Sequence, residues 1–314
     1  MSCPAQQGQP SEGFAKERLN TVRVYKQRGR YDYGTVHSIT DSTLVSHVAF
    51  IIKDEDGEDT PVNLPLTCVL GRYNPSADYS TIDDAQLRTE KNKSLVDGPV
   101  EAYLHGNAAS LLYKAIKASD ENGVRVCITS TKVDGVVLFL TPNGHSLNYR
   151  SAVLHGTARL VPNSNAEKKR WAMRLLTNHM WQDRWDGTYS VAQSAIQGVQ
   201  VIEVSIRTAS AKVRAANIGD FDPAIVLGQS PGWQQKAVWS GLVPVYETFG
   251  EPVPSGVMDG VETKRAEDEL SQVEKWRLER NKQSKTYAEA AAAASSVEQD
   301  MRERVEKWND SLSL

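Results

Sequence analysis

The chain has 314 residues, of which 40% are hydrophobic, enough for one or two ordinary globular domains. Its formal net charge of -3 gives no electrostatic argument for binding nucleic acid or an anionic membrane surface. No apolar run approaches the roughly 20 residues of a membrane-spanning helix. Cys3, Cys68 and Cys127 are odd in number and far apart, which favours a reducing compartment, so we expect a cytoplasmic protein without a metal site.

Short hydrophobic runs dominate the chain after a polar amino-terminal segment, residues 1–24, which we expect to be flexible. The runs are rich in Val, Ile and Thr and are bounded by Gly, Pro, Asp or Asn, a pattern typical of strands. They are TVHSI, TLVSHVAFII, TPVNLPL, PVEAYL, VRVCITST, GVVLFLT, SAVLHGTARLV and VQVIEVSI. Because only KVD separates VRVCITST from GVVLFLT, we expect a hairpin there and an antiparallel barrel or sandwich overall.

Two helices are predicted among these strands. The first has Leu112 and Ile116 on one face and is followed by Gly123, a residue that favours a helix end. The second begins near Ser164 and Glu167, which have the spacing of a capping box.

Two further segments differ from this pattern. Residues 72–98 are polar and follow neither period, so we expect a long surface insertion between two strands. Residues 262–314 contain 22 charged residues among 53, and their alanine-rich stretch predicts a helical extension. Val297, Met301, Val305, Trp308 and Leu312 recur at helical spacing. This extension could pack on its own chain or bind a partner protein, for example as a coiled coil.

Common catalytic motifs are absent from the sequence. It contains no G-x-G-x-x-G after a strand, no P-loop, no H-E-x-x-H and no G-x-S-x-G. His145 and His155 stand ten residues apart, and taken alone each is better interpreted as a structural histidine than as a metal ligand.

Polar groups gather instead in three segments. YLHGNAAS (103–110) ends a strand; Gly106 would let a ligand approach the backbone, Asn107 is a candidate N-cap, and the helix start would suit a phosphate. GHSLNYRS (144–151) offers a guanidinium and hydroxyls, and SAKVR (210–214) places Lys212 and Arg214 on one side of a strand. An ordinary turn and a solvated surface are the alternatives for the first and third segments, but together the three favour a planar, phosphate-bearing ligand.

The ordered run H-G-x-x-x-S, V-D-G-x-V-L, N-Y-R-S, K-V-R and W-S-G resembles the pyridoxamine 5'-phosphate oxidase-like FMN-binding split barrels. The resemblance is to the flavin-nucleotide-binding branch that contains the nitroimidazole-resistance reductases, and it covers about residues 25–255. It implies an all-β core with flanking helices, a six-stranded antiparallel Greek-key split barrel. It also implies a homodimer with FMN at the subunit interface. Residues 25–255, with the insertion 72–98, would form the FMN-binding domain, and residues 256–314 the charged helical tail.

The resemblance also assigns residues to the site. It implies that GHSLNYRS lines the flavin pocket, that HGNAAS meets the phosphate or ribityl chain, and that SAKVR adds positive charge. The implied cofactor contacts are Val62, Asn63, His105, Gly106, Asn107, Ser110, Thr129, Asn148, Tyr149, Arg150, Ser151, Lys212 and Arg214. His145 is the candidate proton donor to a substrate, with a hydrogen-bonding wall residue as the alternative.

The sequence departs from the family in two places. Leu111 stands where the family usually has an arginine after the H-G-x-x-x-S run, and Gly144 precedes a single histidine where the family often has two. The leading hypothesis is an FMN-dependent oxidoreductase, a reductase or oxidase, acting on a small organic molecule in detoxification or specialised metabolism. The alternatives are a non-catalytic protein that binds a flavin or haem as carrier, sensor or scavenger, and a pseudo-enzyme whose tail recruits a partner.

Overall fold

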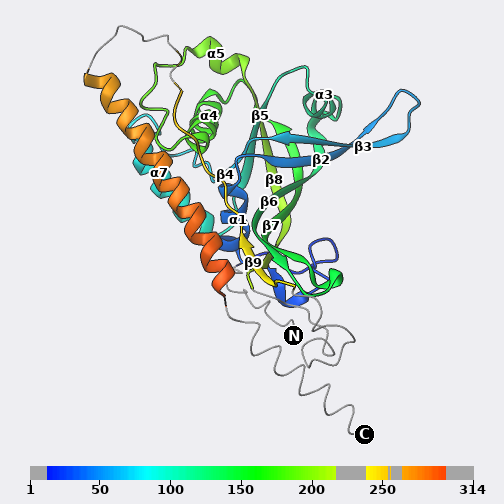
Figure 1. Ribbon diagram of the computed structural model, residues 1–314. Helices are drawn as coiled ribbons and strands as arrows, with labels where there is room; N and C mark the ends of the chain where they lie inside the picture. The colour runs from blue at the N-terminus through cyan, green and yellow to red at the C-terminus, as the bar shows by residue number, and fades with distance from the viewer. Residues whose placement is uncertain (1–12, 217–237, 254, 256–263, 295–314) are drawn as a thin grey trace, which may run out of the picture. The chain divides into compact units, whose positions relative to one another are not determined.

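The computed structural model describes residues 13–216, 238–253, 255 and 264–294 (Figure 1). The chain divides into two compact units. The first unit contains residues 1–132 and 151–212, and the second contains residues 133–150 and 213–314. None of the helices in the described ranges is both long and apolar enough to span a membrane.

The core is an antiparallel sheet whose strands follow the order β3-β2-β6-β7-β8-β5-β4, with β1 on β8 and β9 on β6. The strands are β1 Gly29–Arg30, β2 Ser46–Lys53, β3 Asp59–Leu66, β4 Cys68–Gly71, β5 Glu101–Gly106, β6 Val124–Leu138, β7 Ser146–Leu160, β8 Gln200–Arg214 and β9 Gly241–Pro244. The predicted β core with flanking helices is confirmed. In the described residues the sheet has nine strands rather than six, and it is not closed into a barrel.

The helices are α1 Tyr33–Ser42, α2 Asp84–Asp97, α3 Leu111–Ala118, α4 Ala166–Met180, α5 Gln193–Gly198 and α7 Lys264–Ala293, with 3-10 turns at Lys26–Arg28, Asp120–Asn122 and Pro142–Gly144. In the first unit, α1, α2 and α4 all contact β4 at the edge of the sheet (Figure 1). The predicted N-terminus of α4 at Ser164 was wrong by one residue, because the Asn165 side chain accepts a hydrogen bond from the Lys168 N–H and caps the helix.

TVHSI, predicted as a strand, lies in the helix α1. The Asp32 side chain accepts a hydrogen bond from the Thr35 N–H and caps this helix at its start. Val36 and Ile39 are buried at helical spacing, so capping and packing outweigh the strand preference of β-branched residues.

The predicted hairpin between VRVCITST and GVVLFLT is also wrong, because the first run and the start of the second, up to Leu138, belong to the single strand β6. The connecting residues Lys132–Asp134 all have negative φ, whereas the tight hairpin turn needs residues that adopt positive φ. Asp134 is buried inside the strand, so a charged residue there does not mark a turn.

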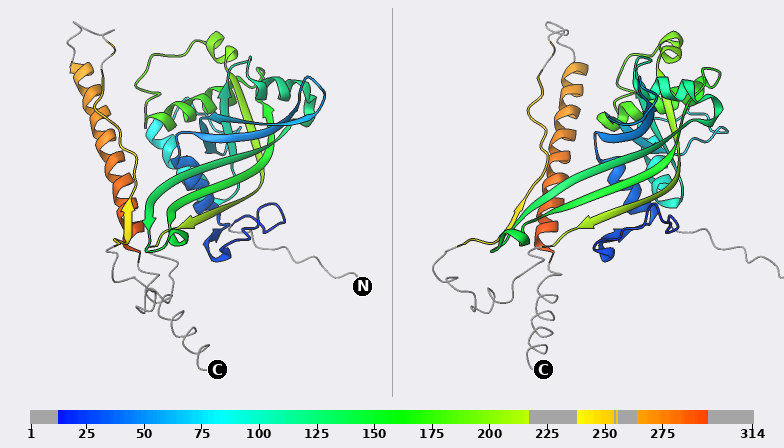
Figure 2. Two further views of the ribbon diagram at one scale, coloured as in Figure 1. Left: turned by 45° about the vertical axis from the view of Figure 1, so that its right-hand side comes forward. Right: turned by 90° about the vertical axis from the view of Figure 1, so that its right-hand side faces the viewer.

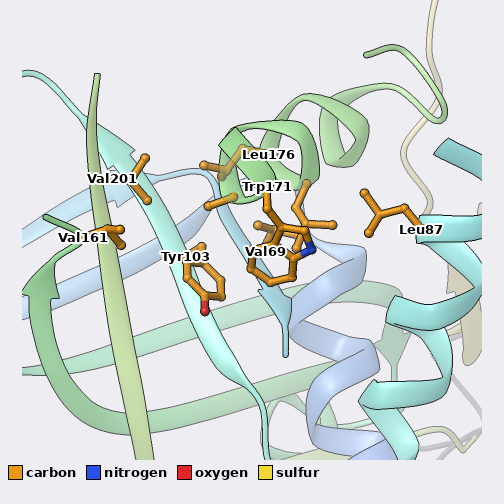
Figure 3. Close-up of a cluster of buried hydrophobic side chains, with 9 residues drawn as sticks. Val69, Leu87, Tyr103, Val161, Trp171, Leu176 and Val201 are labelled. Carbon is orange, nitrogen blue, oxygen red and sulfur yellow. The ribbon is translucent and has the colours of Figure 1, made fainter. Parts of the chain in front are cut away.

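The insertion 72–98 contains the helix α2, which its polar sequence did not predict. Asp83 and Gln86 form a reciprocal capping box at its start, and Leu87 and Leu95 are its buried apolar side chains. Leu87 joins a hydrophobic cluster whose centre is Trp171 of α4 (Figure 3). The insertion is therefore packed, through its helix, onto the rest of the first unit.

His37 of α1 gives a prediction about pH. Its ring is fully buried, stacks on Tyr33 and contacts Phe14 edge-on, and its Nδ1–H donates to the Leu95 carbonyl at 2.8 Å. Nε2 is buried without a hydrogen-bond partner in the described structure, and burial lowers the pKa of His37 below its ordinary value of 6.5.

Near and below that value the unfolded state binds more protons than the folded state, so stability present above pH 6.5 is lost as the pH falls. We expect the melting temperature to fall between about pH 7.5 and about pH 5.5, and to fall less in His37→Asn. Exposed His145→Asn serves as the control. Equal pH dependence of wild type and His37→Asn would exclude His37 as the source.

In the second unit, β9 pairs with β6 from Gly135↔Pro244 to Leu138↔Gly241 and contacts α7 (Figure 2). Residues 245–253 then run alongside α7 in space. The Asn281 amide group bonds both backbone groups of Phe249, accepting from N–H at 2.7 Å and donating to C=O at 3.0 Å. The predicted C-terminal helical extension is confirmed as α7, while the apolar residues 297–312 of the predicted pattern lie outside the described residues.

Candidate functional site

The segment Asn148-Tyr149-Arg150-Ser151 lies in β7, and its side chains are divided between two faces of the strand. Successive side chains of a strand alternate, so Asn148 and Arg150 share one face while Tyr149 and Ser151 share the other. The Ser151 hydroxyl donates to the Lys212 carbonyl at 3.3 Å. These four residues therefore form two sites at most, one on each face.

Arg150 is the best-defined polar group of the second unit. Its Nε and Nη2 donate to the two carboxylate oxygens of Asp134 at 3.0 and 2.7 Å, and the Asp134 side chain is 5% exposed. The guanidinium also lies over the ring of Tyr287 in α7, with its Cζ 3.4 Å from the ring centroid. None of the printed hydrogen bonds of the described residues uses Nη1, so this side of the guanidinium is available to a ligand.

Asn148 and Arg214 are buried next to this pair and bond to one another. Nη1 of Arg214 donates to the Asn148 Oδ1 at 2.5 Å, and the Asn148 amide N–H donates to the Ala291 carbonyl of α7 at 3.3 Å. Asn148 is fully buried and Arg214 is 4% exposed. In this arrangement the Asn148 and Arg214 side chains bond to one another, so direct contact with a cofactor requires them to leave these partners.

The first unit has a second polar surface on the sheet β3-β2-β6. Ala49 of β2 pairs with Asn63 of β3 and with Cys127 of β6, and His47 pairs with Thr129, so all five share one face. Asn63 and His47 are exposed, while Ala49, Cys127 and Thr129 are partly exposed. Burial raises the pKa of the Cys127 thiol, which keeps it protonated and unreactive.

Val62 does not belong to this surface. It pairs with buried Phe50 on the opposite face of the sheet, because adjacent residues of a strand point in opposite directions. The predicted pair Val62-Asn63 therefore brings only the Asn63 side chain to the same face as Thr129.

The turn after β5 holds the residues predicted to meet a phosphate. His105 is exposed, and Ser110 rather than Asn107 caps α3, accepting a hydrogen bond from the Tyr113 N–H at 3.3 Å. The Asn107 side chain accepts from the Ala109 N–H at 2.8 Å. A Cβ on Gly106 would meet only the Ser110 hydroxyl, at 3.7 Å, so the chain itself does not require a glycine there.

This turn and Lys212 lie at opposite ends of β8. His105 and Gly106 pair with Val201 and Gln200 at its start, whereas Lys212 pairs with Gly29 near its end. The twelve residue steps from Gln200 to Lys212 correspond to about 40 Å of strand. The two groups cannot bind one nucleotide within a single chain.

His145 follows the turn Pro142–Gly144 and is exposed. Its Nδ1 lies 3.0 Å from the Thr141 carbonyl, which can only accept, so Nδ1 carries a proton and the neutral ring leaves Nε2 bare. Proton donation from Nε2 would therefore require the imidazolium form. Among the described residues, no group of three or more His, Cys, Asp or Glu side chains could hold a metal ion.

Sequence reasoning missed Asp134 and Tyr287. Asp134 had a usable signal, because a carboxylate inside the apolar run VDGVVL needs a cation when it is buried. Tyr287 had none, since its contact with Arg150 joins segments far apart in the sequence.

Comparisons with known proteins support the fold. The family model for pyridoxamine 5'-phosphate oxidase matches residues 32–213. A comparison with curated proteins gave no match. The structure of the flavocytochrome Anf3 from Azotobacter vinelandii is 24% identical, with a TM-score of 0.55 over 80% of this chain and 96% of that one. The FAD and heme binding protein from Mycobacterium smegmatis is 19% identical, with a TM-score of 0.55 over 77% and 96%.

A putative 5-nitroimidazole antibiotic resistance protein from Bacteroides thetaiotaomicron is 19% identical, with a TM-score of 0.38 over 57% of this chain and 81% of that one. At such identities the two similarities with a TM-score of 0.55 concern the fold alone.

Proposed function

Because this chain belongs to the pyridoxamine 5'-phosphate oxidase family, we propose that it binds a flavin nucleotide, FMN first, and uses it in an oxidoreductase reaction on a small organic molecule. The observation that carries this proposal is the family match, whose range contains every predicted cofactor contact except Arg214. A bound flavin supplies the electron transfer, while the protein binds, orients and shields it.

The surface of β3-β2-β6 fits the flat ring of a flavin. Small side chains, Ala49 and Cys127, leave the middle of the surface open, and Asn63 and Thr129 offer hydrogen-bonding groups beside it. A planar apolar ring with polar edges needs this combination. We assign Asn63 and Thr129 to the ring and leave the Val62 side chain out.

Lys212 and the His105–Ser110 turn can bind the same phosphate only if they come from two chains. Lys212 and the His105–Ser110 turn are separated along β8 within one chain, so a shared nucleotide requires a homodimer. We expect sedimentation of the FMN-loaded protein to give twice the chain mass. A monomer with one FMN per chain would contradict the shared site.

His145 remains our proposed proton donor to the substrate, since it is exposed and an imidazolium ring can donate a proton. Its role requires protonation of Nε2, because Nδ1 is directed at the Thr141 carbonyl.

The visible spectrum of the purified protein tests the function. A flavin spectrum that dithionite bleaches, and that an added organic acceptor restores, is the expected result. A colourless protein that takes up no added FMN would overturn the proposal.

The second candidate is a flavin- or haem-binding protein without turnover. It is favoured by the names of the two structures of similar fold, which describe a flavocytochrome and an FAD and heme binding protein. His47, His105 and His145 are the exposed histidines that could ligate a haem iron. A Soret band, or a flavin that no acceptor reoxidises, would favour this candidate.

Leu111→Arg tests the phosphate end of the proposal. Leu111 is 44% exposed at the first position of α3, so a longer side chain meets no packing constraint. A guanidinium there would supply the cation that the family usually has, and we expect FMN to bind about tenfold tighter, the worth of one charge-assisted hydrogen bond.

Fluorescence titration of FMN measures this effect, with Leu111→Gln as the uncharged control. Equal affinities in Leu111→Arg and Leu111→Gln would remove the α3 turn from the phosphate site.

A further inference from the structure

The hairpin between β2 and β3 ends in a strongly acidic turn. Residues 54–59, the acidic tip, have the sequence DEDGED, in which five of six side chains are carboxylates. Asp54 shapes the turn, because its Oδ1 accepts from the N–H groups of Asp56 and Glu58 at 3.0 and 2.9 Å. Glu55 and Glu58 are exposed, and among the described residues neither side chain has a hydrogen-bond or ion-pair partner. The acidic tip therefore presents unneutralised negative charge from an ordered turn.

The arm that carries the acidic tip extends beyond its neighbouring strand (Figure 1). β2 pairs with β3 as far as Lys53, but with β6 only from His47 to Ala49. The outer part of the hairpin is therefore two-stranded, and such a ribbon is marginally stable without further support. Ile51 on this arm is 57% exposed. The arm thus combines negative charge with an exposed apolar side chain, which suits contact with a basic protein surface.

The first unit carries the opposite charge in its amino-terminal segment. Residues 16–30, the basic segment, contain six lysines and arginines and one glutamate, whereas the whole chain has a net charge of -3. Arg23 and Lys26 are exposed, and their side chains have no hydrogen-bond or ion-pair partner in the part of the chain that the structure describes. Val24 between them is 64% exposed. This surface is complementary to the acidic tip in charge and in its apolar side chain.

The basic segment is fixed to the end of β8. The Asn20 side chain is buried and donates to the Ala209 carbonyl at 2.9 Å. Gly29 of β1 pairs with Lys212. Because these contacts already hold the segment in place, a partner does not need to order it on binding.

The acidic tip and the basic segment lie at opposite ends of the sheet. β6 begins at the end near the tip, because it is antiparallel to β2. At this same end, Arg159 of β7 donates to the Glu121 carbonyl just before β6. The Val161 N–H then donates to the Val201 carbonyl at the start of β8. Lys212 and the basic segment are therefore at the far end of β8, and no ion pair of the described residues joins the two surfaces within one chain.

We propose that the acidic tip of one chain docks on the basic segment of a second copy, in a two-fold dimer that makes this contact twice. A two-fold axis can turn one copy end for end, so that surfaces at opposite ends of a chain meet in pairs. The inference rests on the proposed function only for the association of two chains, and it deepens it by naming the surfaces. The docking also brings the hairpin that carries Asn63 toward the partner's basic segment, which is paired with Lys212.

Charge reversal in the full-length protein tests the docking. Glu55→Lys/Glu58→Lys reverses the acidic tip, and Arg23→Glu/Lys26→Glu reverses the basic segment. We expect each variant to dimerise at least about tenfold more weakly in sedimentation equilibrium, because attraction becomes repulsion at two symmetric contacts. Melting curves verify that the variants fold.

A mixture of the two reversed variants separates charge pairing from other damage. Each variant repels its own copies, but in the mixture a basic tip meets an acidic segment and an acidic tip meets a basic one. We expect a heterodimer with about the wild-type dissociation constant. Lys93→Glu/Arg125→Glu, which reverses two exposed cations outside both surfaces, is the matched control and should dimerise like wild type. A mixture that remains monomeric would overturn the docking.

The docking and the proposed function fail in different ways. If both reversed variants dimerise like wild type, the docking is wrong, and FMN uptake by these dimers leaves the flavin proposal intact. A monomeric wild type would overturn the docking and leave the two surfaces to unlike partners. A dimer that reversal breaks and mixing restores, but that takes up no FMN, supports the docking and overturns the flavin proposal.

Discussion

Arg174→Met is expected to lower the free energy of unfolding by about 3–5 kcal/mol, because it leaves a buried carboxylate without its cation. Nε of Arg174 donates to Asp84 at 2.6 Å, and Nη2 donates to Asp186 at 3.0 Å. The side chains of Arg174 and Asp84 are 7% and 2% exposed. Charges this deeply buried are scarcely screened by solvent, so removal of one partner is costly.

The same guanidinium also joins the insertion to α4. It donates to the carbonyls of Tyr79 and Ile82 at 3.1 and 3.0 Å, and these two acceptors would also lose their partner. Because α2 buries few apolar side chains, we expect the insertion to detach first. Hydrogen exchange in residues 79–97 should therefore rise more than in the strands.

Denaturant unfolding measures the loss, with Arg170→Met as the control. Arg170 lies on the same helix, and within the described part of the chain its side chain makes one long hydrogen bond, 3.5 Å to Gln193. In Asp84→Asn/Arg174→Met the buried carboxylate is neutralised and only Asp186, whose side chain is 44% exposed, loses its cation, so part of the stability should return. If Arg174→Met lowers the free energy of unfolding by less than about 1 kcal/mol, the Arg174–Asp84 pair contributes no more than an ordinary surface ion pair and the prediction is wrong.

The strands were predictable where one physical rule decided them. β3 alternates exposed and partly buried residues, and its prolines Pro61 and Pro65 are tolerated because the strand lies at the edge of the sheet. The prediction of TVHSI as a strand was wrong because the Asp32 cap and the burial of side chains at helical spacing in α1 outweighed the strand preference of its β-branched residues. The helix α2 was not predicted because the contact that holds it in place, between Asp84 and Arg174, joins residues 90 positions apart in the sequence.

The site was predictable to the level of the segment and not of the contact. The sequence correctly indicated NYRS as a polar part of a strand. Strand alternation, however, places Arg150 and Ser151 on opposite faces. Long-range packing then decides which of these side chains remain available to a ligand. Asn148 and Arg214 bond to one another, and Nη1 of Arg150 has no partner among the described residues because Asp134 approaches the other edge of the guanidinium. Such differences depend on partners that a local motif does not contain.

Arg150→Ala is expected to weaken FMN binding by about 1.5–3 kcal/mol, roughly tenfold to more than a hundredfold, the usual contribution of a charge-assisted hydrogen bond. The dissociation constant from flavin fluorescence measures the effect. Arg159→Ala is the control, because that exposed guanidinium bonds only the Glu121 and Asn122 carbonyls among its described hydrogen bonds.

The Arg150 result must be separated from damage to the fold. Removal of the guanidinium leaves Asp134 buried and unpaired, which destabilises the second unit and could weaken binding indirectly. Asp134→Asn/Arg150→Ala removes the unpaired charge, so its melting temperature should return toward that of wild type. If Arg150 binds the phosphate, FMN affinity stays low in this double variant despite the recovered fold. If affinity recovers together with stability, Arg150 is a structural residue and the phosphate is bound elsewhere.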